Sequence, residues 1–184
     1  MPPPADQLID EALQARREGR HEDAKANLAE AIDLCRKASS RSDLARALSA
    51  LGQIERDLHH LDAALQHYEE ACAIYREEGN HPKLAHTVRH LGDIHRSAGH
   101  ATSAEPCYVE ALRIYRNTPQ TTPLELANAV RGFALLKGDA GDSPRAISLW
   151  TQARRLYEEA GVTEGVAECN RRLAALIRTS PEPR

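Results

Sequence analysis

The segment 51–80, LGQIERDLHHLDAALQHYEEACAIYREEGN, decides the fold because it returns at 91–120 as LGDIHRSAGHATSAEPCYVEALRIYRNTPQ. At this offset of 40 residues the Leu-Gly pair falls on a second Leu-Gly pair, and the Ile-Tyr-Arg triplet at 74–76 falls on the same triplet at 114–116. Many matches at one fixed offset are the sequence signature of a repeat protein.

The same frame extends to most of the chain. Upstream, Ala24 and Ala31 stand 40 residues before Ala64 and Ala71. Downstream, an offset of 42 keeps the apolar face of the helix apolar, and the two extra residues then fall in the NTPQTTP loop. The frame predicts four repeats and a last helix that caps the array, at residues 5–38, 41–78, 81–118, 122–160 and 163–179.

Each unit is predicted to be a pair of helices, because apolar residues recur at spacings of three and four. Thr122, Pro123 and Glu125 form an N-terminal signal with a capping residue, a proline and a capping-box glutamate. Pro106 and Pro144 are expected in the first turns of second helices, where a missing N–H group is tolerated. The predicted fold class is all-α, a right-handed superhelical solenoid of stacked antiparallel helix pairs.

Small residues are expected where the two helices of a pair approach each other. Replacement of Ala104 by a larger residue would overpack such a contact. First-helix residues Gly52, Gly92, Ala134 and Ala174 are expected to meet second-helix residues Ala64, Ala104 and Ala146.

The repeat resembles the tetratricopeptide repeat family. The resemblance rests on the Leu-Gly pair, the glycine at the turn between helices, and the alanine–aromatic–alanine series on the second helix. The family's usual period is about 34 residues, so a period of 40 is similar to the long-helix variety found in kinesin light chains and some bacterial regulators. The resemblance implies an array that binds proteins or peptides in a concave groove lined by the first helices.

Composition narrows the function further. A net charge of -3 and a pI near 6.3 argue against a protein that binds nucleic acid by general phosphate attraction. The apolar runs are too short for a membrane span, and the N-terminal sequence has no secretory leader, so a bacterial cytoplasmic location is expected. The termini MPPP and TSPEPR are expected to be disordered. No motif indicates a cofactor, and the four cysteines are expected to be buried small hydrophobes.

One stretch contains residue types that are typical of a metal site. His86, His90 and Asp93 can share one helix face, as in a two-histidine, one-carboxylate metal site. The adjacent Arg89 and Arg96 would oppose a cation, so the preferred interpretation is a solvated face with an Arg89–Asp93 pair and no metal.

Transferring the groove-facing positions from the family gives a set of candidate binding residues. The set contains rows of arginines, whose guanidinium groups match carboxylates bidentately. The alternative is that arginine appears on any solvated face, because the chain has 20 Arg and 4 Lys. The lysine–asparagine clamp of chaperone-tail-binding members is absent at Ile9, Leu13, Ser49, Gln53 and Asp93. The candidates are Arg16, Arg46, Gln53, Arg56, His86, Arg89, Asp93, Arg96, Asn128, Arg131, Leu135, Arg171 and Arg178.

The predicted function is a non-enzymatic adaptor or scaffold that holds a protein or peptide segment, including an acidic one, in this groove. A regulatory sensor that binds a signalling peptide or small effector is the main alternative. An enzyme is the third alternative, although no set of residues satisfies the usual requirements for catalysis. The sequence leaves the oligomeric state open.

Overall fold

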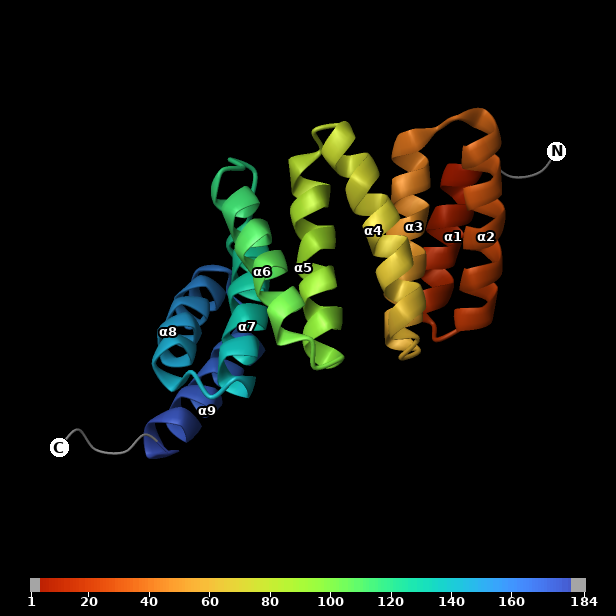
Figure 1. The fold of residues 1–184 in the computed structure, drawn as a ribbon. Coiled ribbons are helices and arrows are strands. Elements are labelled where there is room, and N and C mark those ends of the chain that lie inside the picture. The colour runs from red at the N-terminus through yellow and green to blue at the C-terminus, as the bar shows by residue number, and fades with distance from the viewer. Residues whose placement is uncertain (1–3, 180–184) are drawn as a thin grey trace. The chain divides into compact units, whose positions relative to one another are not determined.

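A computed structural model describes residues 4–179, and these residues form helices joined by short turns (Figure 1). The expectation of disordered termini concerns mainly residues 1–3 and 180–184, which lie outside the described part. The all-α prediction is confirmed. The helices are α1 (Ala5–Arg17), α2 (His21–Ala38), α3 (Arg41–Asp57), α4 (Leu61–Glu77), α5 (His81–Ser97), α6 (Ala101–Arg116), α7 (Pro123–Asp139), α8 (Ser143–Glu159) and α9 (Thr163–Thr179).

The apolar spacing predicted from the sequence corresponds to the buried stripe of each helix. In α5 the buried stripe includes Leu84, Val88 and Leu91, which follow one another at intervals of four and three residues. In α4 it includes Tyr68 and Tyr75, with the buried Ala71 between them. Since residues at these intervals lie on one helix face, each helix buries one side and exposes the other.

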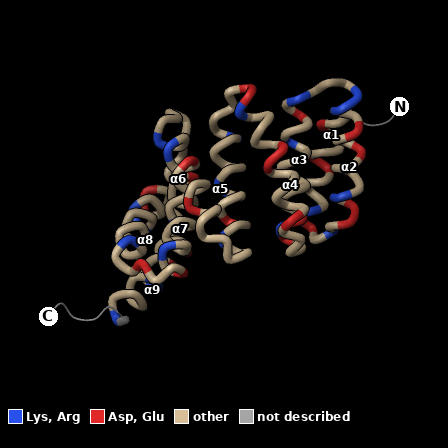
Figure 2. The backbone as a smooth tube through the Cα atoms, in the orientation of Figure 1, with Lys and Arg blue, Asp and Glu red and all other residues tan. Residues whose placement is uncertain are grey.

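The chain divides into two compact units, one up to Ile94 and one from His95. In the first unit α1 packs on α2, α3 packs on α4, and α3 also packs on α1 and α2. In the second unit α7 packs on α6 and α8, and α8 packs on α9. Most of α5 belongs to the first unit and its last turn to the second. Lysines, arginines and carboxylates occur on helices of both units (Figure 2).

The turns between helices use the left-handed conformation that the sequence predicted at glycines. Gly99 has φ +78°, which suits a residue without a side chain. The equivalent residue one repeat earlier is His59, which adopts φ +63° despite its side chain. The turn geometry is therefore imposed by the repeat and not chosen by the local residue.

The predicted start of α7 is confirmed. The Thr122 hydroxyl accepts a hydrogen bond from the Glu125 backbone N–H at 3.3 Å, and the Glu125 carboxylate accepts one from the Thr122 backbone N–H at 2.8 Å. This reciprocal pair satisfies two N–H groups that a helix leaves unpaired at its start.

The placement of Pro106 in a first turn is wrong. Helix α6 begins at Ala101, so Pro106 lies inside it and removes the N–H group that would bond the carbonyl of Thr102. Pro144 does lie at the start of α8, as expected. Pro106 is therefore five residues beyond the start of α6, one turn deeper than expected.

Close approach occurs at Gly52, but its nearest neighbour differs from the one expected. A Cβ atom on Gly52 would lie 3.1 Å from the Tyr68 ring, so the glycine makes room for an aromatic ring of α4 and not primarily for Ala64. Cys35, Cys72 and Cys169 are buried free thiols as predicted, whereas Cys107 is partly exposed and donates to the Ser103 carbonyl oxygen at 3.3 Å.

Two ion pairs, each with one buried partner, join the second helix of one repeat to the first helix of the next. Lys25 Nζ lies 2.9 Å from Glu55 Oε1 between α2 and α3, and Lys137 Nζ lies 2.6 Å from Glu105 Oε1 between α7 and α6. Glu55 and Lys137 occupy equivalent positions in the repeat frame, so the two contacts are the same contact with the charges exchanged.

Candidate functional site

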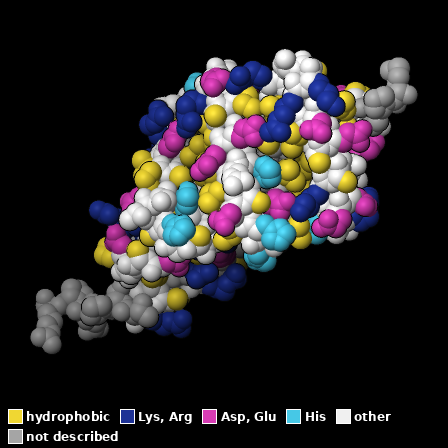
Figure 3. Space-filling model, turned by 45° about the vertical axis from the view of Figure 1, so that its right-hand side comes forward, with side chains coloured by type: hydrophobic (Ala, Val, Ile, Leu, Met, Phe, Trp, Pro, Cys, Tyr) yellow, Lys and Arg dark blue, Asp and Glu magenta, His cyan; other side chains and the backbone are white. Residues whose placement is uncertain are grey.

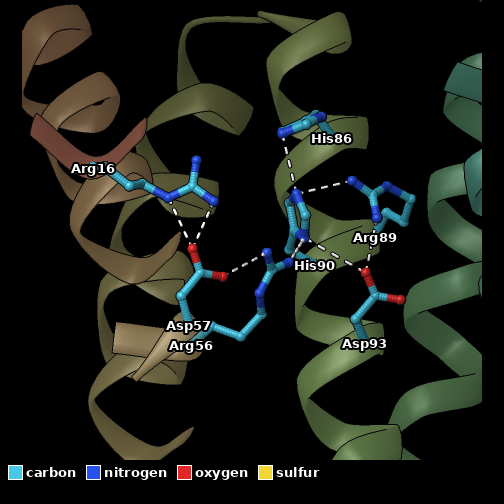
Figure 4. A network of polar contacts seen from close by, with 7 residues as sticks. All are labelled: Arg16, Arg56, Asp57, His86, Arg89, His90 and Asp93. Atoms are coloured by element: carbon cyan, nitrogen blue, oxygen red, sulfur yellow. Dashed lines mark hydrogen bonds and ion pairs between the residues drawn. The ribbon is translucent and has the colours of Figure 1, made fainter. Parts of the chain in front are cut away.

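Polar side chains of α1, α3 and α5 in the first unit form a network centred on His90 (Figure 4). His90 is only 4% exposed. Its Nδ1 lies 2.5 Å from Arg56 Nη1, and its Nε2 lies 2.8 Å from Arg89 Nη2 and 3.2 Å from His86 Nε2. We call this set the arginine–histidine network; its members are Arg16, Arg56, Asp57, His86, Arg89, His90 and Asp93.

His90 is neutral in this setting. Burial lowers the pKa of His90 to about 3, and the neighbouring guanidinium groups act in the same direction, although Asp93 opposes them. A neutral imidazole has one acceptor nitrogen, so it accepts a hydrogen bond from only one of the two guanidiniums that face it. The other guanidinium retains an N–H group that an additional acceptor could satisfy.

Carboxylates connect the network across helices. Asp57 accepts from Arg16 of α1 at 2.6 and 2.8 Å and from Arg56 at 3.2 Å. Burial raises the pKa of Asp57, but the hydrogen bonds from Arg16 and the charges of both arginines outweigh it and hold this pKa below its ordinary value. The Asp57 carboxylate therefore stays ionised and holds α1 and α3 together.

The Arg89–Asp93 pair expected from the sequence is present, with Arg89 Nη1 2.8 Å from Asp93 Oδ2. His90 Nδ1 also lies 3.5 Å from the same oxygen. Within residues 4–179, no group of three or more metal-ligating side chains is close enough to hold a metal ion. Both ring nitrogens of His90 instead face guanidinium groups, which compete with a cation for them.

A pocket opens beside this network, still within the first unit. Its volume is about 150 Å³. It brings together three of the sequence-predicted candidates, Arg46, Gln53 and His86, with residues that were not among the candidates. We call it the Tyr68 pocket; it is lined by Leu13, Arg46, Ser49, Ala50, Gln53, Tyr68, Tyr75, Lys83, His86 and Thr87.

Tyr68 differs from its repeat equivalent in how its hydroxyl is used. The Tyr68 hydroxyl is buried and has no hydrogen-bond partner among the described residues. Its ring stacks on His90 at 5.4 Å between centroids. One repeat later, the Tyr108 side chain hydrogen-bonds to Arg96. In the first unit the equivalent arginine, Arg56, turns to Asp57 and His90 instead, which leaves Tyr68 without that partner.

The remaining first-unit candidates lie at the edge of this pocket. The Arg46 guanidinium pairs with Asp10, and Gln53 lines the pocket wall. Lys83, which is not among the sequence-predicted candidates, is exposed at the pocket, and its side chain makes no hydrogen bond or ion pair among residues 4–179. Burial of the Tyr68 side chain raises its pKa well above the ordinary value, so the phenol remains a proton donor.

In the second unit several candidates are held by internal contacts. Arg96 Nη1 lies 3.0 Å from Asp139 Oδ2, and Arg131 forms a two-pronged contact of 2.6 and 2.9 Å with Glu168. The Asn128 side-chain oxygen accepts from the Tyr157 hydroxyl at 2.8 Å.

Three second-unit candidates are left. Leu135 lines a separate pocket of about 230 Å³ together with Trp150 and Arg172. Arg171 and Arg178 are exposed on α9, and their side chains have no hydrogen bond or ion pair in the part of the chain that the structure describes.

Three residues of the first-unit site were not predicted from the sequence. His90 was expected on a solvated helix face, whereas the residue is 4% exposed. Tyr68 was counted only within the alanine–aromatic–alanine series, and Lys83 was not considered. The signal for the ion pairs was available, since Arg16 and Asp57 are 41 residues apart, close to one repeat. No sequence pattern distinguishes Tyr68 from Tyr108, because the difference arises from where Arg56 points.

Comparison with known proteins identifies the repeat. Residues 9–77 match the family described as "Tetratricopeptide repeat". None of the curated proteins matches the chain in sequence at a significant level. The crystal structure of BtubC (BKLC) from P. vanneervenii has a similar fold, with a TM-score of 0.72 and 21% identity over 97% of this chain and 83% of that chain.

These comparisons agree with the helix pairs described above. Repeats of this family generally mediate protein–protein interactions, and the scaffold is generally non-catalytic. None of the described helices combines the length and apolar character that crossing a membrane requires. Residues 9–77 therefore match the tetratricopeptide repeat family, and the chain as a whole has the fold of an all-α helical-repeat solenoid.

Proposed function

We propose that the chain is a non-enzymatic interaction module that binds an extended, acidic peptide segment of a partner protein on its first helices. The observation that supports this is the charge balance of the first-unit site. The network and pocket hold five cations, whereas the carboxylates in contact with them number three, although the whole chain carries a net charge of -3. The cations are Arg16, Arg46, Arg56, Lys83 and Arg89, and the carboxylates are Asp10, Asp57 and Asp93.

The internal ion pairs do not prevent such binding. An exposed ion pair contributes about 0–1 kcal/mol, so a carboxylate of a peptide can replace or join an internal carboxylate at little cost. Arg46 and Asp10 form such an exposed pair. A guanidinium has five N–H donors and can serve two carboxylates at once. Charged side chains of both signs surround the exposed hydrophobic ones on the face shown in Figure 3, as expected of a polar recognition surface.

The size of the Tyr68 pocket helps to decide between a peptide and a small effector. Sites for whole small molecules usually enclose about 300–1,000 Å³, whereas this pocket has about 150 Å³. That volume suits one side chain of a longer ligand. It supports an adaptor that binds a peptide over a sensor that binds a small effector. A sensor that binds a signalling peptide would use the same surface.

A peptide array tests the proposal. The array carries acidic peptides and, beside each, the same peptide with every Asp and Glu replaced by Asn and Gln. The parent protein is compared with Lys83→Glu, which reverses an exposed, unpaired charge at the pocket rim, and with Lys37→Glu, a matched charge reversal on the exposed end of α2.

We expect the parent and Lys37→Glu to bind a common set of acidic peptides and to ignore their amide forms. Lys83→Glu should lose most of these peptides, because it removes a cation and adds a like charge at the site. Absence of any acidic peptide bound by the parent would refute the proposal. Equal binding by Lys83→Glu and Lys37→Glu would place the interaction elsewhere on the chain.

A further inference from the structure

We propose that the Tyr68 pocket is an anchor site for a single carboxylate of the bound peptide, with the Tyr68 hydroxyl as a specificity-determining donor and Lys83 at the rim. This rests on the proposed peptide-binding function and specifies which atoms contact the ligand. It assigns a binding role to a second-helix tyrosine that the repeat pattern otherwise explains as packing.

The pocket walls offer donors and positive charge. Lys83 and Arg46 contribute cations, and Gln53 and Tyr68 contribute neutral donors. None of the lining residues is an aspartate or a glutamate. The positive charge and the absence of carboxylates in the lining favour a ligand group with acceptors, and a carboxylate supplies two oxygens with about four acceptor positions.

The Tyr68 hydroxyl provides the second and independent observation. The residue is 1% exposed, and a buried hydroxyl without a partner is unfavourable, which makes such groups rare in folded proteins. In the other unit the equivalent Tyr108 has Arg96 as its partner. The first unit has the equivalent arginine, Arg56, but it contacts His90 and Asp57, so the unpaired hydroxyl distinguishes Tyr68 from Tyr108.

The neighbouring network favours an anion as well. His90 stacks on the Tyr68 ring and leaves one of two guanidinium contacts unsatisfied, as described above. The apolar part of the wall, formed by Leu13 and Ala50, can contact the aliphatic carbons next to a carboxylate. The ligand this predicts is a carboxylate next to a small apolar group, carried either by an Asp or Glu side chain or by the end of a chain.

Three tripeptide probes distinguish these sources. Acetyl-Ala-Leu-Asp-amide carries only a side-chain carboxylate, acetyl-Ala-Leu-Ala with a free C-terminus carries only a chain-end carboxylate, and acetyl-Ala-Leu-Asn-amide carries neither. Each is titrated into the full chain, and NMR signals of ring-labelled tyrosine and of the Gln53 side-chain amide report binding.

We expect saturable shifts of the Tyr68 and Gln53 signals with at least one carboxylate probe and none with the amide probe. A response to the aspartate probe alone would show that the pocket binds the carboxylate of an Asp or Glu side chain. A response to the free C-terminus alone would show that it binds the carboxylate at the end of a chain. Equal responses to all three probes, or no response to any, would overturn the proposal.

The variant Tyr68→Phe isolates the hydroxyl, because it keeps the ring that packs on Gly52 and His90. Since a hydrogen bond to a charged group is stronger than a neutral one, affinity for the carboxylate probe should fall about tenfold or more. The melting temperature of the free protein should stay level or rise, because a hydroxyl without a partner is removed.

Tyr108→Phe is the matched control at the equivalent position. It removes a hydrogen bond that the free protein makes with Arg96, so we expect its Tm to fall by about 2–4 °C while probe affinity is unchanged. Unchanged probe affinity in Tyr68→Phe would overturn the role of the hydroxyl. If array peptides still bind the parent in that case, the proposed function stands without this anchor site.

Discussion

The buried Lys25–Glu55 contact leads to the sharpest prediction about stability. The Glu55 side chain is 8% exposed and touches Lys25 Nζ at 2.9 Å and His60 Nδ1 at 2.7 Å. Replacing Lys25 by Met keeps the aliphatic stem but leaves Glu55 with His60 alone. Removing one partner of a fully buried pair costs about 3–5 kcal/mol. Lys25 is 30% exposed, and water can partly replace it, so we expect a loss of about 2 kcal/mol.

The pH dependence of this loss has a defined sign. Burial raises the pKa of Glu55, but the hydrogen bonds from Lys25 and His60 outweigh it, so the pKa lies below the ordinary value of 4.5. The contact therefore stabilises the fold at pH values above that ordinary value, and its contribution is lost as the pH falls through the lowered pKa. The difference between Lys25→Met and the parent should be full at pH 7 and shrink in acid.

Thermal unfolding followed by circular dichroism measures this difference. For a chain of this size, about 2 kcal/mol corresponds to a Tm decrease of about 4–8 °C at pH 7. Lys37→Met is the matched control, because it makes the same chemical change at an exposed lysine of the same helix. The reasoning is refuted if both variants have the same Tm at pH 7, or if the deficit of Lys25→Met is the same in acid.

Three further predictions concern backbone and packing, and each is checked by the free energy of unfolding in urea. His59→Gly should stabilise the protein by up to about 1 kcal/mol, since a left-handed conformation is strained for a residue with a side chain; a loss would contradict this. Pro106→Gln restores an N–H donor for the Thr102 carbonyl and should stabilise α6 by up to about 3 kcal/mol; no gain would mean that the helix has adapted to the proline. Ala104→Leu should destabilise by about 1–3 kcal/mol, because Ala104 is fully buried against Tyr108 and Leu136; parental stability would show that the site has spare volume.

The repeat pattern predicted the local structure of this chain well. Spacing of apolar residues gave the helices, and Thr122 with Glu125 gave the start of α7, because both signals act between residues a few positions apart. The placement of Pro106 in a first turn failed because the proline lies five residues beyond Ala101, where its missing N–H group leaves a backbone carbonyl without its helical partner.

The candidate site could be predicted only in part. Family register placed Arg16, Arg56 and Arg89 on one exposed side. It did not show that Asp57 joins the first two, or that His90 is buried between the last two. These contacts link different helices, and their existence depends on side-chain directions that a repeat pattern does not contain.

Sequence by itself therefore determined the repeat, the helical character of the chain and the residues that form each buried stripe, because these follow from local propensity and periodicity. Only the tertiary structure decided how equivalent residues in successive repeats are used. Arg96 hydrogen-bonds to Tyr108, whereas Arg56 turns to His90 and leaves the Tyr68 hydroxyl unpaired. The physical reason is that a buried polar group takes whichever partner the neighbouring helix brings within hydrogen-bond distance, and in the first unit that partner is a histidine.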